Sequence, residues 1–409
     1  MRQIAAADAA RVLRSTAAIR SRARQLLGLA RSGRSTYFSV NDAAMADAAR
    51  TVAALTRERY PDGRIPYHSR WRHFEAGGVN RRAHLDAALG EIGAVERARA
   101  QIDLVLVSVL LDAGAGAEWT YREAGSGQSF ARSEGLGVAS FHAFLHGLFS
   151  GDPQQPLRVD AVGLQRVTAN DLAHAFQVSD NNPLVGLEGR ASLLRHLGAV
   201  LAAQPAVFGP LGRPGGLFDA LSVEGQGLVQ AHDILVLLLE TLSGIWPAQN
   251  AIGGEALGDC WRHPAVEGEG LTAGWMPFHK LSQWLTYSLL EPFEWAGIRV
   301  TGLDALTGLP EYRNGGLLID AGVLCPLPAD WGTRAWQAGD TFIVEWRALT
   351  VALLDEIAPL VRAELGLSEQ QMPLACVLEG GTWAAGRWLA QRVRGGLPPL
   401  NIVSDGTVF

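Results

Sequence analysis

The stretch Asp340–Leu365, DTFIVEWRALTVALLDEIAPLVRAEL, carries the clearest fold signal in the chain. Its apolar residues recur at steps of three and four positions, which is the spacing of one face of an α-helix. Alternation with a period of two, which indicates a half-buried strand, is scarce here and throughout the sequence. The pattern therefore predicts a long amphipathic helix.

Segments of the same kind lie along the rest of the chain. Helices are predicted over residues 1–60, 138–149, 189–204, 227–242 and 280–291, the last ending at Pro292. Residues 97–111 contain LVLVSVLL, which is apolar on every side and fits a buried helix or a buried strand. The tail, residues 398–409, fits a short strand. Because strand alternation is scarce, the predicted fold is mainly α, with few short strands.

The length of 409 residues allows two or three domains or one large one. Residues 150–168 contain Pro153 and Pro156 and form the first plausible linker. The predicted division is an N-terminal helical region, 1–150, and a C-terminal helical region, 151–409, that carries the main motifs. A single continuous globular unit is the alternative.

Composition excludes several classes of protein. Lys and Arg number 35 against 41 Asp and Glu, a net charge of −6, so a chain-wide basic surface for nucleic acid is absent. No run reaches about 18 apolar residues, so no membrane span is expected. Residues 1–34 lack a secretory apolar core and fit a first helix better than a transit peptide. The three cysteines are far apart and form no CxxC pair, which favours a cytoplasmic protein.

The only lysine of the chain is Lys280, and the other 34 basic residues (35 − 1) are arginines. Lysine differs from arginine where a compact charge that can lose its proton is required. On a helix, Gln283, Trp284 and Tyr287 share the face of Lys280, because they follow it by three, four and seven residues. This stripe predicts a binding surface. A half-buried helix with an exposed lysine is the alternative.

Carboxylates in two further segments are candidates for catalysis. Glu311 and Tyr312 follow a proline and precede a glycine pair, in a loop or at a helix start. Asp320 follows three apolar residues, so burial would raise its pKa and suit it to acid catalysis. A structural aspartate whose hydrogen bonds are satisfied fits Asp320 equally well.

The segment Gly258–Pro264, GDCWRHP, contains a third candidate carboxylate, Asp259. A metal site formed by Asp259, Cys260 and His263 is weakly indicated, because no second group of ligands stands out. No metal and no cofactor are therefore predicted. Motifs for dinucleotide binding, for a P-loop and for serine or zinc hydrolases do not occur.

The segment His68–Gly78, HSRWRHFEAGG, combines arginines and histidines with aromatic residues. Arg70, Arg72 and His73 could bind a phosphate or a carboxylate, since guanidinium groups bind these anions in a bidentate manner. A surface loop whose arginines pair with acidic residues is an equal alternative. Asp112 and Glu134 add two acids beside glycine-rich turns.

Together these segments resemble the uracil-catabolism family of the ring-opening pyrimidine pathway. The motifs that carry the resemblance are HSRWRHFEAGG (68–78), LLDAGAG (110–116), RSEGL (132–136), NPLVGLEGR (182–190), PFHKLSQWLTYSLLEP (277–292), LTGLPEYRNGGLLIDAGVL (306–324), LEGGTWAAGR (378–387) and SDGTVF (404–409). The resemblance extends from about residue 60 to the C-terminus. It implies a role downstream of a cyclohydrolase-like partner enzyme, on a ribosylurea-type intermediate.

A more distant similarity bears on mechanism. Residues 280–283, KLSQ, and 311–313, EYR, resemble the Lys-Arg-Ala-Gln and Asp-Tyr-Arg motifs of the queuosine-salvage N-glycosidases. The similarity implies an all-helical, DNA-glycosylase-like architecture. It also implies that an aspartate upstream of the lysine, best matched by Asp259, attacks the sugar, while Glu311 and Tyr312 hold the leaving group. Glutamate in place of aspartate lengthens that arm, so a different leaving group is expected.

The predicted function is hydrolysis of the ribosyl C–N bond of ribosylurea or its 5′-phosphate, which gives urea and ribose or ribose phosphate. Asp259, Glu311 and Asp320 are the predicted catalytic residues. The predicted substrate-binding residues are Lys280, Gln283, Trp284, Tyr312, Arg313, Arg70, Arg72, His73, Asp112 and Glu134. Two alternatives are a hydrolase that cuts the urea amide and a carrier without enzymatic activity.

Overall fold

The computed structural model describes residues 5–222, 227–245 and 250–403, and these residues form two compact units. Unit 1 consists of residues 5–68, 250–283 and 302–403, and unit 2 of the remaining described residues. Each unit therefore combines segments that are far apart in the sequence. Residue 150, where the sequence suggested a boundary, lies inside unit 2.

Unit 1 is mainly helical. Its helices and single turns are α1 (Ala6–Leu13), α2 (Thr16–Arg31), η1 (Asp42–Ala44), α3 (Met45–Arg59), η4 (Gly270–Thr272), η5 (Leu303–Ala305), α15 (Tyr312–Asp320), α16 (Thr341–Leu365), α17 (Leu374–Val377), the π-helical turn η6 (Leu378–Thr382) and α18 (Trp383–Arg394). Helix α16 is the long helix predicted over 340–365, and it ends at Gly366, whose positive φ terminates helices without strain.

Unit 2 is also mainly helical. Its helices and single turns are α4 (Arg70–Phe74), η2 (Ala76–Gly78), α5 (Arg81–Leu89), α6 (Ala94–Leu110), α7 (Arg132–Leu145), α8 (Ala161–Arg166), α9 (Ala169–Ala175), α10 (Leu187–Ala202), α11 (Pro205–Phe208), α12 (Gly216–Leu221), α13 (Ala231–Leu242) and η3 (Ser243–Ile245). The apolar run LVLVSVLL belongs to α6, so the structure decides for the buried helix.

The strands are two or three residues long and form separate pairs. In unit 1, β1 (Phe38–Val40) pairs with β10 (Leu324–Pro326), β5 (Ala251–Ile252) with β6 (Glu255–Ala256), β7 (Cys260–Arg262) with β8 (Trp275–Pro277), and β11 (Ala335–Trp336) with β12 (Asn401–Ile402). In unit 2, β2 (Thr120–Arg122) pairs with β3 (Ser129–Ala131), and β4 (Leu228–Gln230) with β9 (Arg299–Thr301). The mainly α prediction is confirmed. The finer likeness to DNA glycosylases stays a prediction.

Strand β12 occupies part of the predicted tail strand. The last motif of the sequence, SDGTVF at 404–409, lies outside the described residues.

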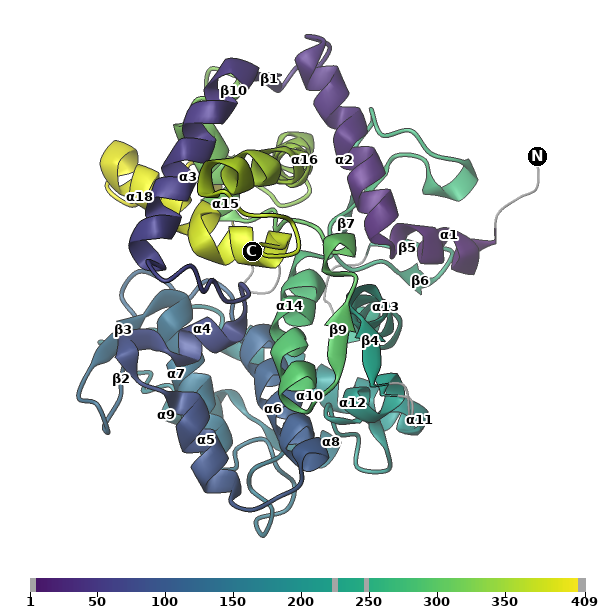
Figure 1. Cartoon of the computed structure of the whole chain (residues 1–409). Helices are drawn as coiled ribbons and strands as arrows, with labels where there is room; N and C mark the ends of the chain where they lie inside the picture. The colour runs from purple at the N-terminus through teal and green to yellow at the C-terminus, as the bar shows by residue number, and fades with distance from the viewer. Residues whose placement is uncertain (1–4, 223–226, 246–249, 404–409) are drawn as a thin grey trace. The chain divides into compact units, whose positions relative to one another are not determined.

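Helices from the two ends of the sequence pack together in unit 1. Figure 1 shows α2 and α3 beside α16, and the close residue contacts of α16 with both helices agree with this view. The buried side of α2, which includes Ile19, Leu26 and Leu27, supplies apolar surface to this packing. Helix α16 is therefore central to unit 1, as expected for the longest apolar stripe in the sequence.

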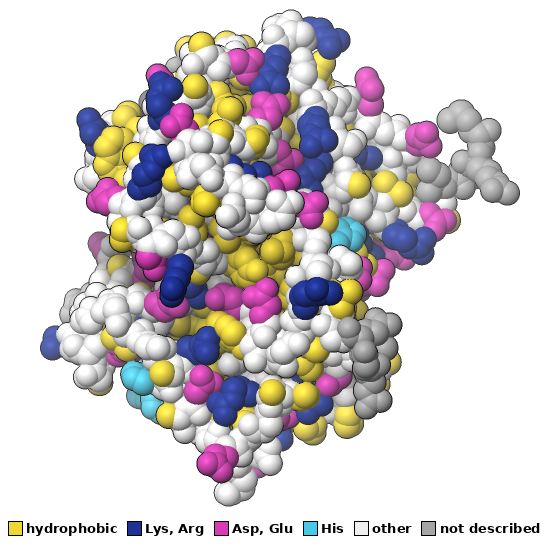
Figure 2. Space-filling model, in the orientation of Figure 1, with side chains coloured by type: hydrophobic (Ala, Val, Ile, Leu, Met, Phe, Trp, Pro, Cys, Tyr) yellow, Lys and Arg dark blue, Asp and Glu magenta, His cyan; other side chains and the backbone are white. Residues whose placement is uncertain are grey.

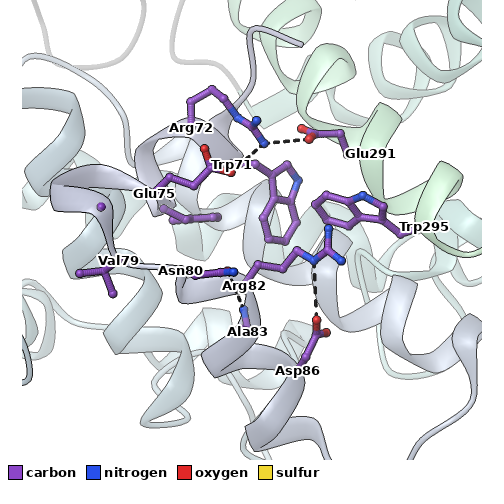
Figure 3. Close-up of a pocket in the computed structure, with 12 residues that line it drawn as sticks. Trp71, Arg72, Glu75, Val79, Asn80, Arg82, Ala83, Asp86, Glu291 and Trp295 are labelled. Atoms are coloured by element: carbon purple, nitrogen blue, oxygen red, sulfur yellow. Dashed lines mark hydrogen bonds and ion pairs between the residues drawn. The ribbon is translucent and has the colours of Figure 1, made fainter. Parts of the chain in front are cut away.

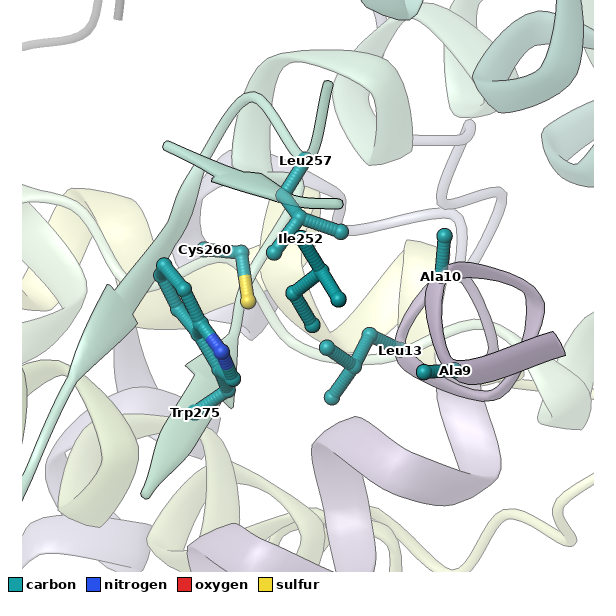
Figure 4. Packing of buried hydrophobic residues seen from close by; sticks show 7 residues of the cluster. All are labelled: Ala9, Ala10, Leu13, Ile252, Leu257, Cys260 and Trp275. Atoms are coloured by element: carbon teal, nitrogen blue, oxygen red, sulfur yellow. The ribbon is translucent and has the colours of Figure 1, made fainter. Parts of the chain in front are cut away.

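Helix α1 packs on the small β-hairpins of unit 1 (Figure 4). Leu13 lies beside Ile252 there, and the same buried cluster contains Leu257, Cys260 and Trp275. Burial raises the pKa of the Cys260 thiol far above its usual range, so this cysteine behaves as a small apolar residue.

Helix α14 (Lys280–Trp295) corrects the predicted helix end at Pro292, because it continues through the proline to Trp295. A proline inside a helix leaves the carbonyl four residues earlier without its usual N–H donor. Here that carbonyl belongs to Ser288, and it accepts a hydrogen bond from the indole Nε1 of Trp71 at 3.1 Å. A tertiary hydrogen bond thus replaces the helical one.

Basic and acidic side chains are interspersed on the face of the molecule seen in Figure 2. Acidic and basic side chains also form ion pairs with one another in each unit, for example Arg99 with Asp219 at 2.8 Å and Arg31 with Asp42 at 2.6 Å. None of the helices in the described part of the chain has the length and apolar character needed to cross a bilayer.

Candidate active site

The division between the units falls inside α14, so the stripe predicted from Lys280 is shared between them. Lys280 and Gln283 belong to unit 1, whereas Trp284 and Tyr287 belong to unit 2. The site residues therefore fall into two groups, one in each unit.

In unit 1, the Asp259 carboxylate is fixed at the start of α14 by four hydrogen bonds. Arg347 of α16 donates to both oxygens, at 2.7 and 2.8 Å. The indole of Trp261 donates to Oδ1 at 2.7 Å, and the backbone N–H of Lys280 donates to Oδ2 at 3.0 Å. Burial by itself would raise the pKa of Asp259, but the Arg347 guanidinium outweighs burial and holds it well below the usual range. Asp259 is therefore ionised and rigidly held.

Glu311 of unit 1 is the N-cap of α15. Its Oε2 accepts from the backbone N–H of Arg313 at 2.8 Å, and its Oε1 accepts from that of Asn314 at 2.7 Å. Burial raises the pKa of Glu311 despite these bonds and despite the nearby positive charges of Lys280 and His68. Asp259 and Glu311 both lie near Lys280, and their pKa values are shifted in opposite directions.

Gln283 holds the chain that leads to Glu311. Its amide Nε2 donates to Thr307 Oγ1 at 2.7 Å, and its Oε1 accepts from the Thr307 backbone N–H at 3.3 Å. Both ends of the fully buried amide are therefore used within the protein. This arrangement fixes the segment before α15 relative to the first turn of α14.

Tyr312 and Arg313 begin α15 directly after Glu311. Burial raises the pKa of the Tyr312 phenol to about 12, so this group keeps its proton at neutral pH. The Arg313 side chain reaches toward the carbonyl of Gly396 at 3.5 Å. Neither residue is tied to Asp259 by any hydrogen bond found in the described residues.

Asp320 lies at the opposite end of α15 from Glu311. Nine residues at a rise of about 1.5 Å per residue place it roughly 13 Å along the helix. It pairs closely with Arg394 of α18, and burial raises its pKa in spite of that arginine. The structure therefore groups Asp259, Lys280 and Glu311 and leaves Asp320 apart from them.

Unit 1 also contains a buried acid that the sequence analysis did not single out. Glu379 in η6 pairs with His68 Nδ1 at 2.8 Å, and its Oε1 accepts from Arg59 at 2.8 Å and from the Tyr60 hydroxyl at 2.9 Å. π-Helical turns are frequent at functional sites. Arg347 was missed as well, although a charged residue inside the apolar run FIVEWRALTV was a usable signal.

In unit 2, Arg70 and Asp112 form a buried ion pair of 3.0 Å. His73 Nδ1 lies 2.9 Å from the same guanidinium, and the Trp284 ring centroid lies 5.6 Å from its central carbon. The charge of Glu134 also acts on Arg70. The structure thus groups five predicted binding residues of unit 2.

Arg72 is separate from this group. It pairs with Glu291 at 2.8 Å and with Glu75 at 3.1 Å. The three residues line a pocket of about 540 Å³, whose wall also includes Trp71 and Trp295 (Figure 3). Arg72 therefore pairs with acidic residues, as the alternative expects, but its segment is helix α4 and not a surface loop.

Candidate metal ligands are not gathered in the described residues, where no group of three His, Cys, Asp or Glu side chains could hold an ion together. In the segment GDCWRHP, Cys260 lies in the apolar cluster of Figure 4, and His263 Nε2 lies 3.1 Å from Glu345.

Comparison with known proteins identifies the family. Residues 12–409 match the family described as "Protein of unknown function (DUF1688)", and the chain belongs to this family. It is 38% identical to "Uracil catabolism protein 4" of Lachancea kluyveri over 411 residues, which cover 92% of this chain and 93% of that protein. It is 42% identical to "Protein urg3" of Schizosaccharomyces pombe over 355 residues, 84% of each chain. The predicted resemblance to a uracil-catabolism family is confirmed.

Proposed function

We propose that this protein acts in uracil catabolism as an N-glycosidase-type hydrolase. Its substrate is ribosylurea or the 5′-phosphate of ribosylurea, and its products are urea and ribose or ribose phosphate. The similarity to "Uracil catabolism protein 4" of Lachancea kluyveri supports the role in uracil catabolism. A cyclohydrolase-like enzyme of the same pathway would supply the substrate, and no cofactor is required.

One observation carries the proposed chemistry. Asp259 and Glu311 are two half-buried carboxylates near Lys280, and their surroundings shift their pKa values apart. Enzymes that cleave glycosidic bonds use such a divergent pair, one acid that donates a proton and one that stays ionised.

The reaction balances with these two groups and one water. The C1′–N bond breaks and its electron pair goes to the urea nitrogen, which receives the proton of Glu311. Water then adds to C1′ and returns a proton to the Glu311 carboxylate. Ionised Asp259, held by four hydrogen bonds, is pre-organised to stabilise the oxocarbenium-like positive charge between these steps. Lys280 and Tyr312 are proposed to bind the substrate.

The test is urea release from ribosylurea and, separately, from its 5′-phosphate, followed by NMR of the sugar. We expect Glu311→Gln and Asp259→Asn each to lower kcat by about 10²- to 10⁴-fold, the usual contribution of a positioned acid or base. Since Glu311 must be protonated, kcat should fall on the alkaline side, and this limb should be lost in Glu311→Gln. Asp320→Asn serves as the control on the same helix and decides the role of the third predicted acid. We expect little loss of kcat per folded molecule from it.

The same assay separates the two alternatives. Release of ammonia instead of urea would indicate cleavage of the amide. Binding of ribosylurea without any product would indicate a carrier. Normal turnover in correctly folded Glu311→Gln and Asp259→Asn would contradict the proposed roles of these residues.

A further inference from the structure

We infer that unit 2 contains a binding site for a neutral amide or urea group, formed by Arg70 and Asp112. This site goes beyond the proposed function, whose chemistry uses residues of unit 1 alone. The inference rests on two buried polar atoms and on the chemistry that would complete their hydrogen bonds.

The loop that carries Asp112 is shaped by a buried arginine. Arg190 of α10 is fully buried and donates to the carbonyls of Leu111, Ala113 and Gly114, the last two at 3.1 and 2.9 Å. A guanidinium that binds three carbonyls of one turn holds the backbone of that turn in a single conformation. Asp112 lies between the held carbonyls, so its position is fixed by the fold.

The side chain of Arg70 is also held in place by several polar contacts. Its side chain is fully buried, and its Nε donates to Ser108 Oγ at 2.7 Å, while Ser108 is 2.6 Å from Ser140 Oγ. Its Nη1 faces the Asp112 Oδ2 at 3.0 Å and donates to the Ser133 carbonyl at 3.2 Å. Three of its polar contacts thus go to α6, α7 and the loop that follows α6.

Two atoms of this pair are left without a hydrogen-bond partner among the described residues, Arg70 Nη2 and Asp112 Oδ1. Both atoms are shielded from solvent, and only 7% of the Asp112 side chain is exposed. Buried polar groups are nearly always hydrogen-bonded, and leaving one unsatisfied is costly. A donor and an acceptor left open on one ion pair therefore indicate that a ligand completes them.

The pair selects the chemistry of that ligand. Nη2 needs an acceptor and Oδ1 needs a donor, and an amide or urea offers a carbonyl oxygen beside an N–H. The positive charges of Arg70 and Arg190 are balanced by the negative charges of Asp112 and Glu134, so neither an anion nor a cation gains a net attraction here. The ring of Trp284, near the guanidinium, offers a flat apolar surface to a planar group.

The test compares three probes of similar shape and different charge on the full-length protein: N-methylurea, methylguanidinium and acetate. Binding is measured by ligand-observed NMR titration. We expect N-methylurea to bind at least about tenfold more tightly than either ion, because each ion leaves one of the two atoms without a partner and gains no net attraction from the balanced charges. Binding of acetate or methylguanidinium as tight as that of N-methylurea, or no binding of N-methylurea, would overturn the inference.

A matched pair of variants locates the site. Asp112→Asn should weaken N-methylurea binding roughly 10- to 100-fold, the size expected for a hydrogen bond to a charged group. Asp103→Asn is the control, because Asp103 is a buried acid of the same unit whose two oxygens are already bound by Arg213, Val159 and Gly215. We expect unchanged binding in Asp103→Asn. Equal affinity in both variants would place the ligand elsewhere and overturn the inference.

The comparison of the three probes on the wild-type protein tests the inferred site even if Asp112→Asn fails to fold. The probe has no glycosidic bond and the readout is binding, so the result is separate from the turnover assay. If the turnover assay shows no hydrolase activity, the result of the binding test still stands.

Discussion

The carboxylate of Glu379 ties three parts of unit 1 together: the end of α3, His68 and the π-helical turn η6. Burial opposes its ionisation, but the hydrogen bonds and charges of His68 and Arg59 outweigh burial and lower its pKa from 4.5 to about 2. A glutamate whose pKa is lowered on folding stabilises the folded state above its unfolded pKa. This contribution is lost as the pH falls from about 4.5 toward about 2.

We predict that Glu379→Gln lowers the free energy of unfolding at neutral pH by about 3 kcal/mol, the size that follows from the shift in pKa. Urea unfolding at pH values from about 7 down to about 3 is the measurement. The difference in the free energy of unfolding between wild type and variant should become smaller as the pH falls below about 4.5. Glu364→Gln, an exposed position in α16, is the control and should stay within about 0.5 kcal/mol. A constant difference at all pH values would contradict the role given to ionised Glu379.

Sequence reasoning at the residue scale located positions better than partners. It placed Glu311 in a loop or at a helix start, and the residue is an N-cap. It assigned Gln283 to substrate, yet both ends of that amide bind Thr307, which lies 24 positions further along the chain. A hydrogen bond between positions so far apart depends on how helices meet, and no local pattern encodes it.

At the scale of elements, glycines decide how closely α15 and α18 approach. A Cβ atom built on Gly386 of α18 would overlap the carbonyl of Arg313 in α15. The final glycine of the motif LEGGTWAAGR, Gly386, therefore has a role in helix packing. In η6, Gly381 in the same way leaves room for the carbonyl of Val52 in α3.

We predict that Gly386→Ala destabilises the protein by about 1–3 kcal/mol or more, because the added methyl group must push the two helices apart. Gly28→Ala in α2 is the matched control, since a Cβ there meets nothing within 4 Å. That control should be neutral or stabilising by up to about 1 kcal/mol, as alanine favours helix. Thermal unfolding of both variants is the measurement. A melting temperature equal to that of wild type in Gly386→Ala would contradict this account of the crossing.

At the scale of the whole molecule, single side chains join segments of unit 1 that are far apart in the sequence. Arg20 of α2 donates to Asp355 of α16 at 2.8 Å and to the carbonyls of Ala305 and Leu306 at 3.0 and 2.6 Å. One side chain thus joins three segments of unit 1 that lie up to 335 positions apart. Arg24, one turn further along α2, reaches the same Asp355 only at 3.7 Å, and 66% of its side chain is exposed.

We predict that Arg20→Met lowers the free energy of unfolding by about 2–4 kcal/mol, because two carbonyls lose their donor and Asp355 keeps only its longer contact with Arg24. Arg24→Met should cost less than about 1 kcal/mol, as is usual for exposed pairs. Urea unfolding of the two variants checks both values. Equal losses would show that the segments are joined by apolar packing alone.

The sequence by itself determined the mainly helical fold class, most of the long helices and the family, because these depend on local periodicity and on contiguous motifs. It also proposed Asp259, Glu311 and Asp320 as catalytic residues and Lys280 as a substrate-binding residue, each on its own motif. Only the tertiary structure decided that α14 runs through Pro292, that Arg347 locks Asp259, and that each unit is built from separated segments. These features depend on contacts between distant parts of the chain, where packing and desolvation, and not local propensity, determine which partner each group finds.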